Sequence, residues 1–120
     1  MRDIHTIIIH CSATRPTWWA MERSDDKVDE IRRWHVEERG WSDIGYHYVI
    51  DRNGDIVEGR SIERTGAHAR GHNKGSVGIC LLGGHGSSAE DDFDDNFTAL
   101  QSEALKELIE ELDVEYDIKD

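Results

Sequence analysis

Three consecutive isoleucines at positions 7–9 run directly into His10, close to the start of the chain. An unbroken run of β-branched residues is typical of a strand covered on both faces, so residues 6–11 are predicted to form a central strand. The small polar residues 12–14 end this strand and leave His10 at its tip. A rigid strand end can hold a metal ligand or a catalytic base. From the residues alone, a second interpretation stays open, in which His10 only forms a hydrogen bond with a backbone carbonyl.

A second apolar run, residues 76–82, predicts another central strand. Between the two runs, the Asn-Gly pair at 53–54 predicts a β-hairpin formed by residues 45–50 and 56–58. The last residues, 114–120, are predicted to begin one more strand.

Two amphipathic helices are predicted near residues 26–39 and 98–112. One of residues 24–26 is expected to cap the first helix, which ends at Gly40. The second helix opens with Thr98, which forms a capping-box pattern with the glutamine three residues later.

Strands and helices therefore alternate over a length that suits one folded unit. We expect residues 1–120 to form a single α/β domain, in which a mixed central β-sheet is flanked by helices.

The charge of the chain is strongly asymmetric. The net charge of the chain is −12, and residues 90–120 account for −11 of it. Such a charge excludes direct nucleic-acid binding. An acidic segment of this kind is typical of a solvated helix face or a partner-docking surface. No apolar run is long enough to cross a membrane, and residues 1–5 lead into the first strand without the apolar region of a signal peptide. We therefore expect a cytoplasmic protein. Its two cysteines, Cys11 and Cys80, are too few for a disulfide framework.

Several blocks in unbroken order resemble the type-2 N-acetylmuramoyl-L-alanine amidases, a family that includes phage lysozymes and peptidoglycan-recognition proteins. The resemblance implies zinc-dependent hydrolysis of the amide bond between N-acetylmuramic acid and L-alanine in peptidoglycan. It also implies a phage or prophage endolysin, which stays in the host cytoplasm until it reaches the cell wall. The matching blocks are residues 9–14, 33–35, 40–48, 66–73, 76–84 and 93–98.

The resemblance carries over to four candidate site residues. His10 matches the first zinc ligand of the family, and Tyr46 matches its active-site tyrosine. A tyrosine hydroxyl can donate a hydrogen bond to the oxyanion that develops during amide hydrolysis. We expect His10 and Tyr46 to open into one groove, with His68 on its rim and Asn73 able to bind a muropeptide. The alternatives are a packed aromatic for Tyr46, a solvated loop histidine for His68 and a turn residue for Asn73.

Strand alternation gives a further expectation for the tyrosine. Tyr46 and Tyr48 should point to one face of the sheet, and His47, which we expect to be structural, to the other.

The family's remaining zinc ligands would follow the segment that ends at Asp120, so His10 is the one family ligand in this chain. Since a catalytic zinc needs three protein ligands, we expect this chain to bind zinc weakly and to cleave peptidoglycan poorly. Three explanations of the single ligand are open. The chain is a shortened amidase, a non-catalytic pseudo-amidase that binds an intracellular partner such as a phage RNA polymerase, or an enzyme with a rebuilt site. An open sheet edge at the C-terminal side would favour self-association or a protein partner. Candidates for a rebuilt site are His68, His72, His85 and Cys80.

Overall fold

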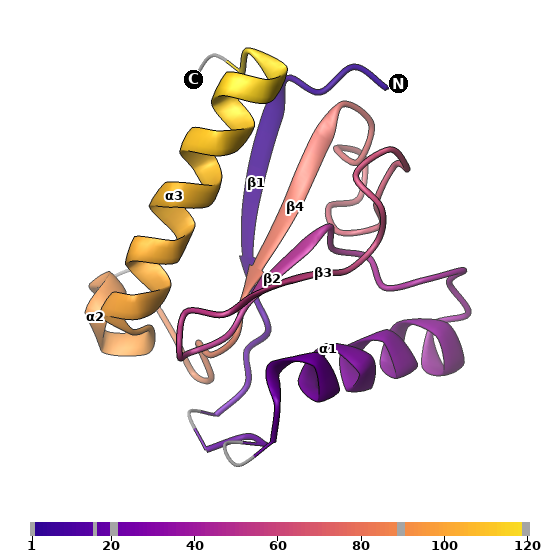
Figure 1. The fold of residues 1–120 in the computed structure, drawn as a ribbon. Coiled ribbons are helices and arrows are strands. Elements are labelled where there is room, and N and C mark those ends of the chain that lie inside the picture. The colour runs from indigo at the N-terminus through magenta and orange to yellow at the C-terminus, as the bar shows by residue number, and fades with distance from the viewer. Residues whose placement is uncertain (1, 16, 20–21, 89–90, 119–120) are drawn as a thin grey trace.

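The computed structural model describes residues 2–15, 17–19, 22–88 and 91–118 (Figure 1). The elements in chain order are β1 (Thr6–Cys11), α1 (Ser24–Arg33), the π-helical η1 (Trp34–Glu38), β2 (Tyr48–Ile50), β3 (Ile56–Glu58), β4 (Ser76–Leu81), α2 (Phe93–Asn96) and α3 (Ala99–Tyr116).

The four strands form one mixed sheet in the order β1-β4-β2-β3. Strands β1, β4 and β2 are parallel, and β3 is antiparallel to β2. Helices α3 and α1 lie on opposite sides of this sheet (Figure 1). The predicted class, a mixed central sheet flanked by helices, is confirmed.

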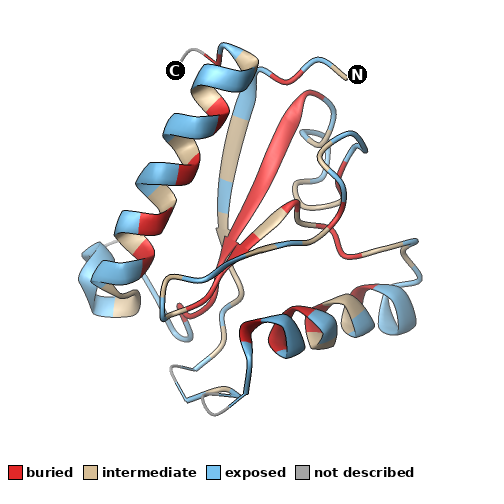
Figure 2. Ribbon diagram, in the orientation of Figure 1, coloured by how far each residue is buried: buried red, intermediate tan, exposed pale blue. Residues whose placement is uncertain are grey.

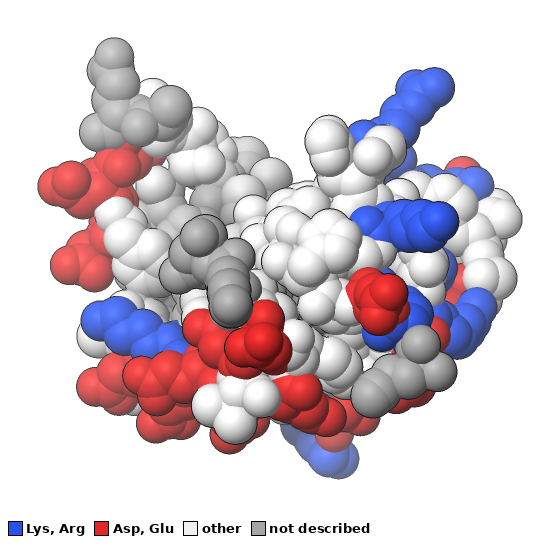
Figure 3. Space-filling view, turned by 90° about the horizontal axis from the view of Figure 1, so that it is seen from above, with Lys and Arg blue, Asp and Glu red and all other residues white. Residues whose placement is uncertain are grey.

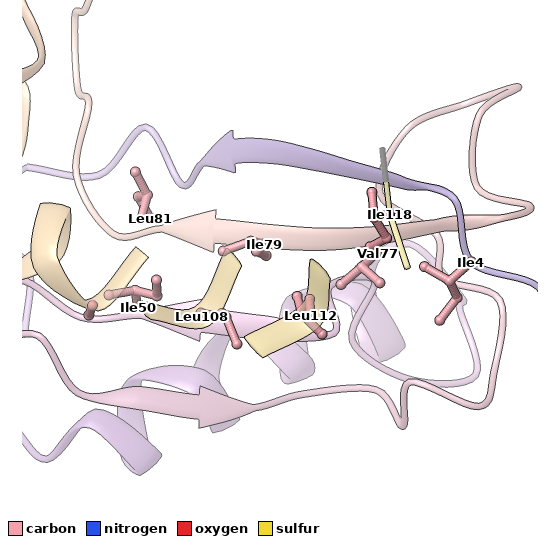
Figure 4. Packing of buried hydrophobic residues seen from close by; sticks show 9 residues of the cluster. Ile4, Ile50, Val77, Ile79, Leu81, Leu108, Leu112 and Ile118 are labelled. Atoms are coloured by element: carbon pink, nitrogen blue, oxygen red, sulfur yellow. The ribbon is translucent and has the colours of Figure 1, made fainter. Parts of the chain in front are cut away.

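Each face of the sheet packs against its own helix because side chains alternate along a strand. Figure 2 shows β4 buried along its length and buried stripes on both helices. The cluster between the sheet and α3 includes Ile50, Ile79, Leu81, Leu108 and Leu112 (Figure 4). The cluster on the α1 side includes Val28, Ile31, Ile44, Val49, Cys80 and Leu82.

Strand β1 occupies an edge of the sheet, which corrects one prediction. Among the described strands it pairs only with β4, and Ile9 on β1 is 46% exposed. The isoleucine run was predicted to be central. The preference of isoleucine for strands reflects how well its side chain fits a pleated, half-buried surface, and it does not indicate how many strands pair with that strand. The prediction for residues 76–82 is confirmed, since β4 lies between β1 and β2.

Helix α1 begins and ends differently from its prediction. Its N-cap is Arg23, without a side-chain cap, and Ser24 is the first helical residue. The Ser24 hydroxyl donates instead to Asp51 at 2.7 Å, so a tertiary contact uses the predicted capping group. The last turns are π-helical, and Gly40 follows them at a φ of 73°, as expected for a helix end.

Helix α3 is longer than predicted. The capping box of Thr98 and Gln101 is confirmed, but the helix continues to Tyr116, where the sequence predicted the start of a strand. Asp117 then adopts a left-handed φ of 51°, and residues 119–120 lie outside the described residues. None of the helices in the described part of the chain has the length and apolarity needed to span a bilayer.

Candidate active site

Three aromatic rings from different parts of the chain meet beside the end of β1. The ring centroid of His10 lies 5.5 Å from that of Tyr46 and 5.0 Å from that of His68. His10 comes from β1, Tyr46 from the segment before β2, and His68 from the loop before β4. The structure therefore brings together three of the four residues predicted for the site.

The orientation of Tyr46 differs from the predicted alternation. Tyr46 packs with the α1-side cluster, whereas Tyr48 packs with the α3-side cluster. The carbonyls of two consecutive residues, Tyr46 and His47, accept from the backbone N–H groups of Arg60 and Gly59, at 2.8 and 2.9 Å. In a regular strand such carbonyls alternate in direction, so this irregularity reverses the face that the tyrosine occupies.

A chain of hydrogen bonds links the two histidines to Ser76. His10 Nε2 lies 2.9 Å from His68 Nδ1, and His68 Nε2 lies 3.2 Å from the Ser76 hydroxyl. Because that hydroxyl donates to the His72 carbonyl at 2.7 Å, it accepts from His68 Nε2–H. His68 Nδ1 is then an acceptor, and His10 donates through Nε2. The lone pair of His10 is therefore on Nδ1.

Burial sets the protonation states at the site. It lowers the pKa of His10, and burial together with the neighbouring His10 and His47 lowers the pKa of His68 to about 4. Burial also raises the pKa of Tyr46, with a further contribution from the hydrogen-bonded thiol of Cys80. At neutral pH both imidazoles are therefore uncharged, and the Tyr46 hydroxyl keeps its proton and can donate it in a hydrogen bond.

The three residues line different hollows. Tyr46 lines one of about 280 Å³, which we call the Tyr46 pocket, with Ser12, Trp34, His35 and Arg39. His68 and Asn73 line another of about 440 Å³, the His68 pocket, with Arg39, Trp41 and Arg70. His10 lines a third of about 380 Å³, with Ile9, Phe93 and Phe97. His10 and Tyr46 thus line separate hollows and not the single groove that was expected. Arg39 lines both the Tyr46 pocket and the His68 pocket.

Asn73 has a turn role in addition to its place on the pocket wall. Its Oδ1 accepts from the backbone N–H groups of His68 and Ala69, both at 2.8 Å. The side chain therefore fixes the loop that carries His68.

His35 is a site residue that the sequence did not predict. It is buried, its Nδ1 accepts from the Gly45 N–H at 2.9 Å, and its ring lies 5.6 Å from Tyr46. It therefore helps to fix the backbone just before the tyrosine. His35 lies in η1, four residues after Ile31, where it continues the apolar stripe of α1, and that position was the available signal.

The donor set at the site can be compared with the needs of a catalytic zinc, the metal that the resemblance implies. Within residues 2–15, 17–19, 22–88 and 91–118, no group of three His, Cys, Asp or Glu side chains could hold a metal ion. His10 and His68 supply two imidazoles that bond to one another. These residues alone do not fit a three-ligand zinc site, and residues 72, 80 and 85 do not complete one.

Comparison with known proteins gives consistent matches. A family model described as N-acetylmuramoyl-L-alanine amidase matches residues 1–120. The endolysin of Klebsiella phage KP32 is 44% identical over 115 residues, which cover 96% of this chain and 70% of that protein. Several solved structures share the fold. The amidase LysC from Clostridium intestinale has a TM-score of 0.73 and 29% identity, and covers 99% of this chain and 68% of that one. Bumblebee PGRP-SA has a TM-score of 0.76 and 28% identity; the match covers 99% of this chain and 66% of that one.

Proposed function

This chain belongs to the N-acetylmuramoyl-L-alanine amidase family, and from that premise we propose that it hydrolyses the amide bond between N-acetylmuramic acid and L-alanine in peptidoglycan. The convergence of the His10, Tyr46 and His68 rings is the observation that carries the proposal. As an endolysin-type enzyme, it is made in the host cytoplasm and acts on the cell wall after release.

Tyr46 is assigned to stabilise the transition state. Its hydroxyl stays protonated because burial raises its pKa, so it donates a hydrogen bond to the scissile carbonyl oxygen as negative charge develops there. A donor that is already oriented when the charge appears lowers the barrier most, because nothing must reorganise.

His10 and His68 are assigned to the reacting side of the amide. Burial lowers the pKa of each and keeps both imidazoles neutral. His10 Nδ1 has the lone pair that can accept a proton from an attacking water or bind a metal ion. His68 accepts from His10 and thereby holds the His10 ring in place. Zinc is the cofactor that the resemblance implies, with His10 as a ligand. Since the described residues do not complete a zinc site, the roles of His10 and His68 rest on their own imidazoles.

Asn73 and His68 are assigned to substrate binding, since both line the His68 pocket. Asn73 Oδ1 is committed to the loop backbone, so the amide nitrogen is the group that can face a muropeptide. The amidase assignment is favoured over a non-catalytic binding protein because an endolysin matches 96% of the chain.

A pair of tyrosine variants tests the proposal. Tyr46→Phe removes only the hydroxyl and should lower the release of peptide from purified peptidoglycan about 100-fold, which is typical for the loss of one oxyanion donor. Tyr48→Phe is the matched control, since Tyr48 packs on the opposite face of the sheet, and should retain activity.

His10→Ala should abolish the release of peptide. Equal activity of the Tyr46→Phe variant and the unaltered protein would refute the assignment of Tyr46. If the folded, unaltered protein released no peptide, the amidase function itself would be refuted.

A further inference from the structure

A row of three tryptophans extends outward from the candidate site. The ring of Trp19 stacks on that of Trp18, with centroids 5.7 Å apart and planes at 27°. Trp18 in turn contacts Trp34, with centroids 5.4 Å apart. We call Trp19, Trp18 and Trp34 the tryptophan row.

The inner part of the row is held firmly. Trp18 and Trp34 pack against the α1-side cluster, and the Trp34 indole N–H donates to Glu30 at 2.8 Å. The row is therefore anchored on helix α1 and does not depend on the loop alone.

The outer end of the row is exposed in spite of its size. Trp19 is 40% exposed, and its backbone lies in the left-handed region at a φ of 49°, which is strained for a bulky residue. A tryptophan whose purpose was packing would be more deeply buried, whereas strained residues that persist are frequent at binding sites.

The row is continuous with the Tyr46 pocket. Trp34 belongs to both, since it lines that pocket beside Tyr46 and His35 and also contacts Trp18. A polymer bound with its scissile amide at Tyr46 would thus pass along a wall that leads to Trp18 and Trp19.

We propose that the tryptophan row is an extended subsite for the glycan strand of the substrate, in which a sugar ring stacks on the exposed face of Trp19. This inference rests on the proposed amidase function. The C–H groups on the face of a pyranose ring carry small positive charges, and the face of an indole ring is negative, so the two attract while apolar surface is buried. The subsite adds affinity for long glycan strands and takes no part in the cleavage of the amide.

The test separates glycan binding from chemistry. Trp19→Ala removes the exposed ring, and Trp19→Phe restores a smaller aromatic surface. Trp18 is left unaltered because it packs on the core. Val114→Ala, on the exposed side of α3, is the control for loss of an exposed apolar side chain. Affinity for peptide-free strands of alternating N-acetylglucosamine and N-acetylmuramic acid is measured by calorimetry.

Hydrolysis is then compared on two substrates, intact peptidoglycan and N-acetylmuramoyl-L-alanyl-D-isoglutamine, which has a single sugar. Trp19→Ala should weaken glycan binding about fivefold, the size expected for one stacking contact. It should raise KM on intact peptidoglycan while turnover of the single-sugar compound is unchanged. Trp19→Phe should recover most of the affinity, and Val114→Ala should match the unaltered protein.

Unchanged glycan affinity in Trp19→Ala would overturn the inference. If that variant then also lost binding to vesicles of phosphatidylglycerol and phosphatidylethanolamine, the row would be assigned to a membrane surface. A failure of the unaltered protein to cleave either substrate would refute the amidase function, and the calorimetric comparison would still decide whether the row binds glycan.

Discussion

His47 shows how contacts in the interior fix the protonation state of one polar side chain next to the site. The residue is 1% exposed. Its Nδ1 accepts from the Gly78 N–H at 3.0 Å, and its Nε2–H donates to the Arg64 carbonyl at 2.8 Å. The Arg2 guanidinium Nη2 lies 3.0 Å from the same Nε2. A proton on Nδ1 would face the Gly78 N–H, which is also a donor, so the ring is held neutral. The expectation that His47 is structural agrees with these contacts.

The neutral state of His47 predicts a pH dependence of stability. Burial lowers its pKa below the ordinary 6.5, helped by the guanidinium groups of Arg2 and Arg60 and opposed by the bond to Arg64. The unfolded chain therefore binds more protons between pH 6.5 and the lowered value. The free energy of unfolding should be fully retained above pH 6.5 and fall as the pH drops below it.

Denaturant unfolding of His47→Gln across about pH 7 to 4 checks this dependence. The variant should be less stable near neutral pH, and its stability should depend less on pH than that of the unaltered protein. Parallel curves for the two proteins would exclude His47 as a source of the pH dependence.

The site residues were predictable to different extents for physical reasons. His10 ends a strand, and that local pattern was visible in the sequence. The face that Tyr46 occupies depends on the backbone N–H groups of Gly59 and Arg60, which reach it from the chain that follows β3. Alternation along one segment could not reveal that contact, so the predicted orientation was wrong.

At the scale of elements, Gln101 connects helix α3 to the sheet. Its Oε1 accepts from the Thr98 N–H at 2.9 Å and completes the helix cap. Its amide nitrogen donates to the carbonyls of Ile50 and Leu82 at 3.1 and 2.9 Å. One buried side chain therefore closes the start of a helix and the ends of two chain segments in the sheet.

Removal of these bonds should be costly. Gln101→Ala removes the side-chain donor to the buried Leu82 carbonyl and one of two donors to the Ile50 carbonyl, which keeps the Leu82 N–H at 3.0 Å. It also opens a cavity, so it should lower the free energy of unfolding by about 2–4 kcal/mol in denaturant titrations. Glu103→Ala, on the exposed side of the same helix, should change it by less than about 0.5 kcal/mol. A comparable small effect for both variants would show that the amide contacts contribute little.

Elements specified by neighbouring residues were predicted well. The capping box of α3, the turn before β3 and the buried run of β4 all have local signals, and all three are present. The edge position of β1 depends on which strands pair with it, and the residues of a strand do not specify its partners. Helix α2 was missed because it is a single capped turn inside an acidic segment.

At the scale of the whole molecule, charge is divided between two sides. Acidic side chains gather on the left of Figure 3, where α3 lies in Figure 1, and continue along the lower edge, while most of the visible Lys and Arg side chains lie on the right. The acidic side corresponds to the segment that holds −11 of the net charge. Such a surface repels itself at low ionic strength.

A charge reversal on α3 tests this repulsion. Glu107 is exposed and lies four residues from both Glu103 and Glu111, which are also exposed. Glu107→Lys turns two repulsive pairs into attractive ones and should stabilise the protein by about 0.5–1 kcal/mol at low salt. The gain should shrink towards zero near about 1 M NaCl, where charges are screened over roughly 3 Å. A gain that persists at high salt would point to a cause other than charge.

The edge position of β1 has a consequence for how the site comes apart. His10 belongs to a strand that, among the described strands, has one neighbour, whereas Tyr46 and His68 sit around the doubly paired β4. A strand held on one side can detach in a sub-global opening that leaves the rest of the molecule folded. Amide protons of β1 should then exchange with deuterium faster than those of β4. Activity should be lost at a lower denaturant concentration than the one that unfolds the whole protein. The site would thus have a lower local stability than the protein that carries it.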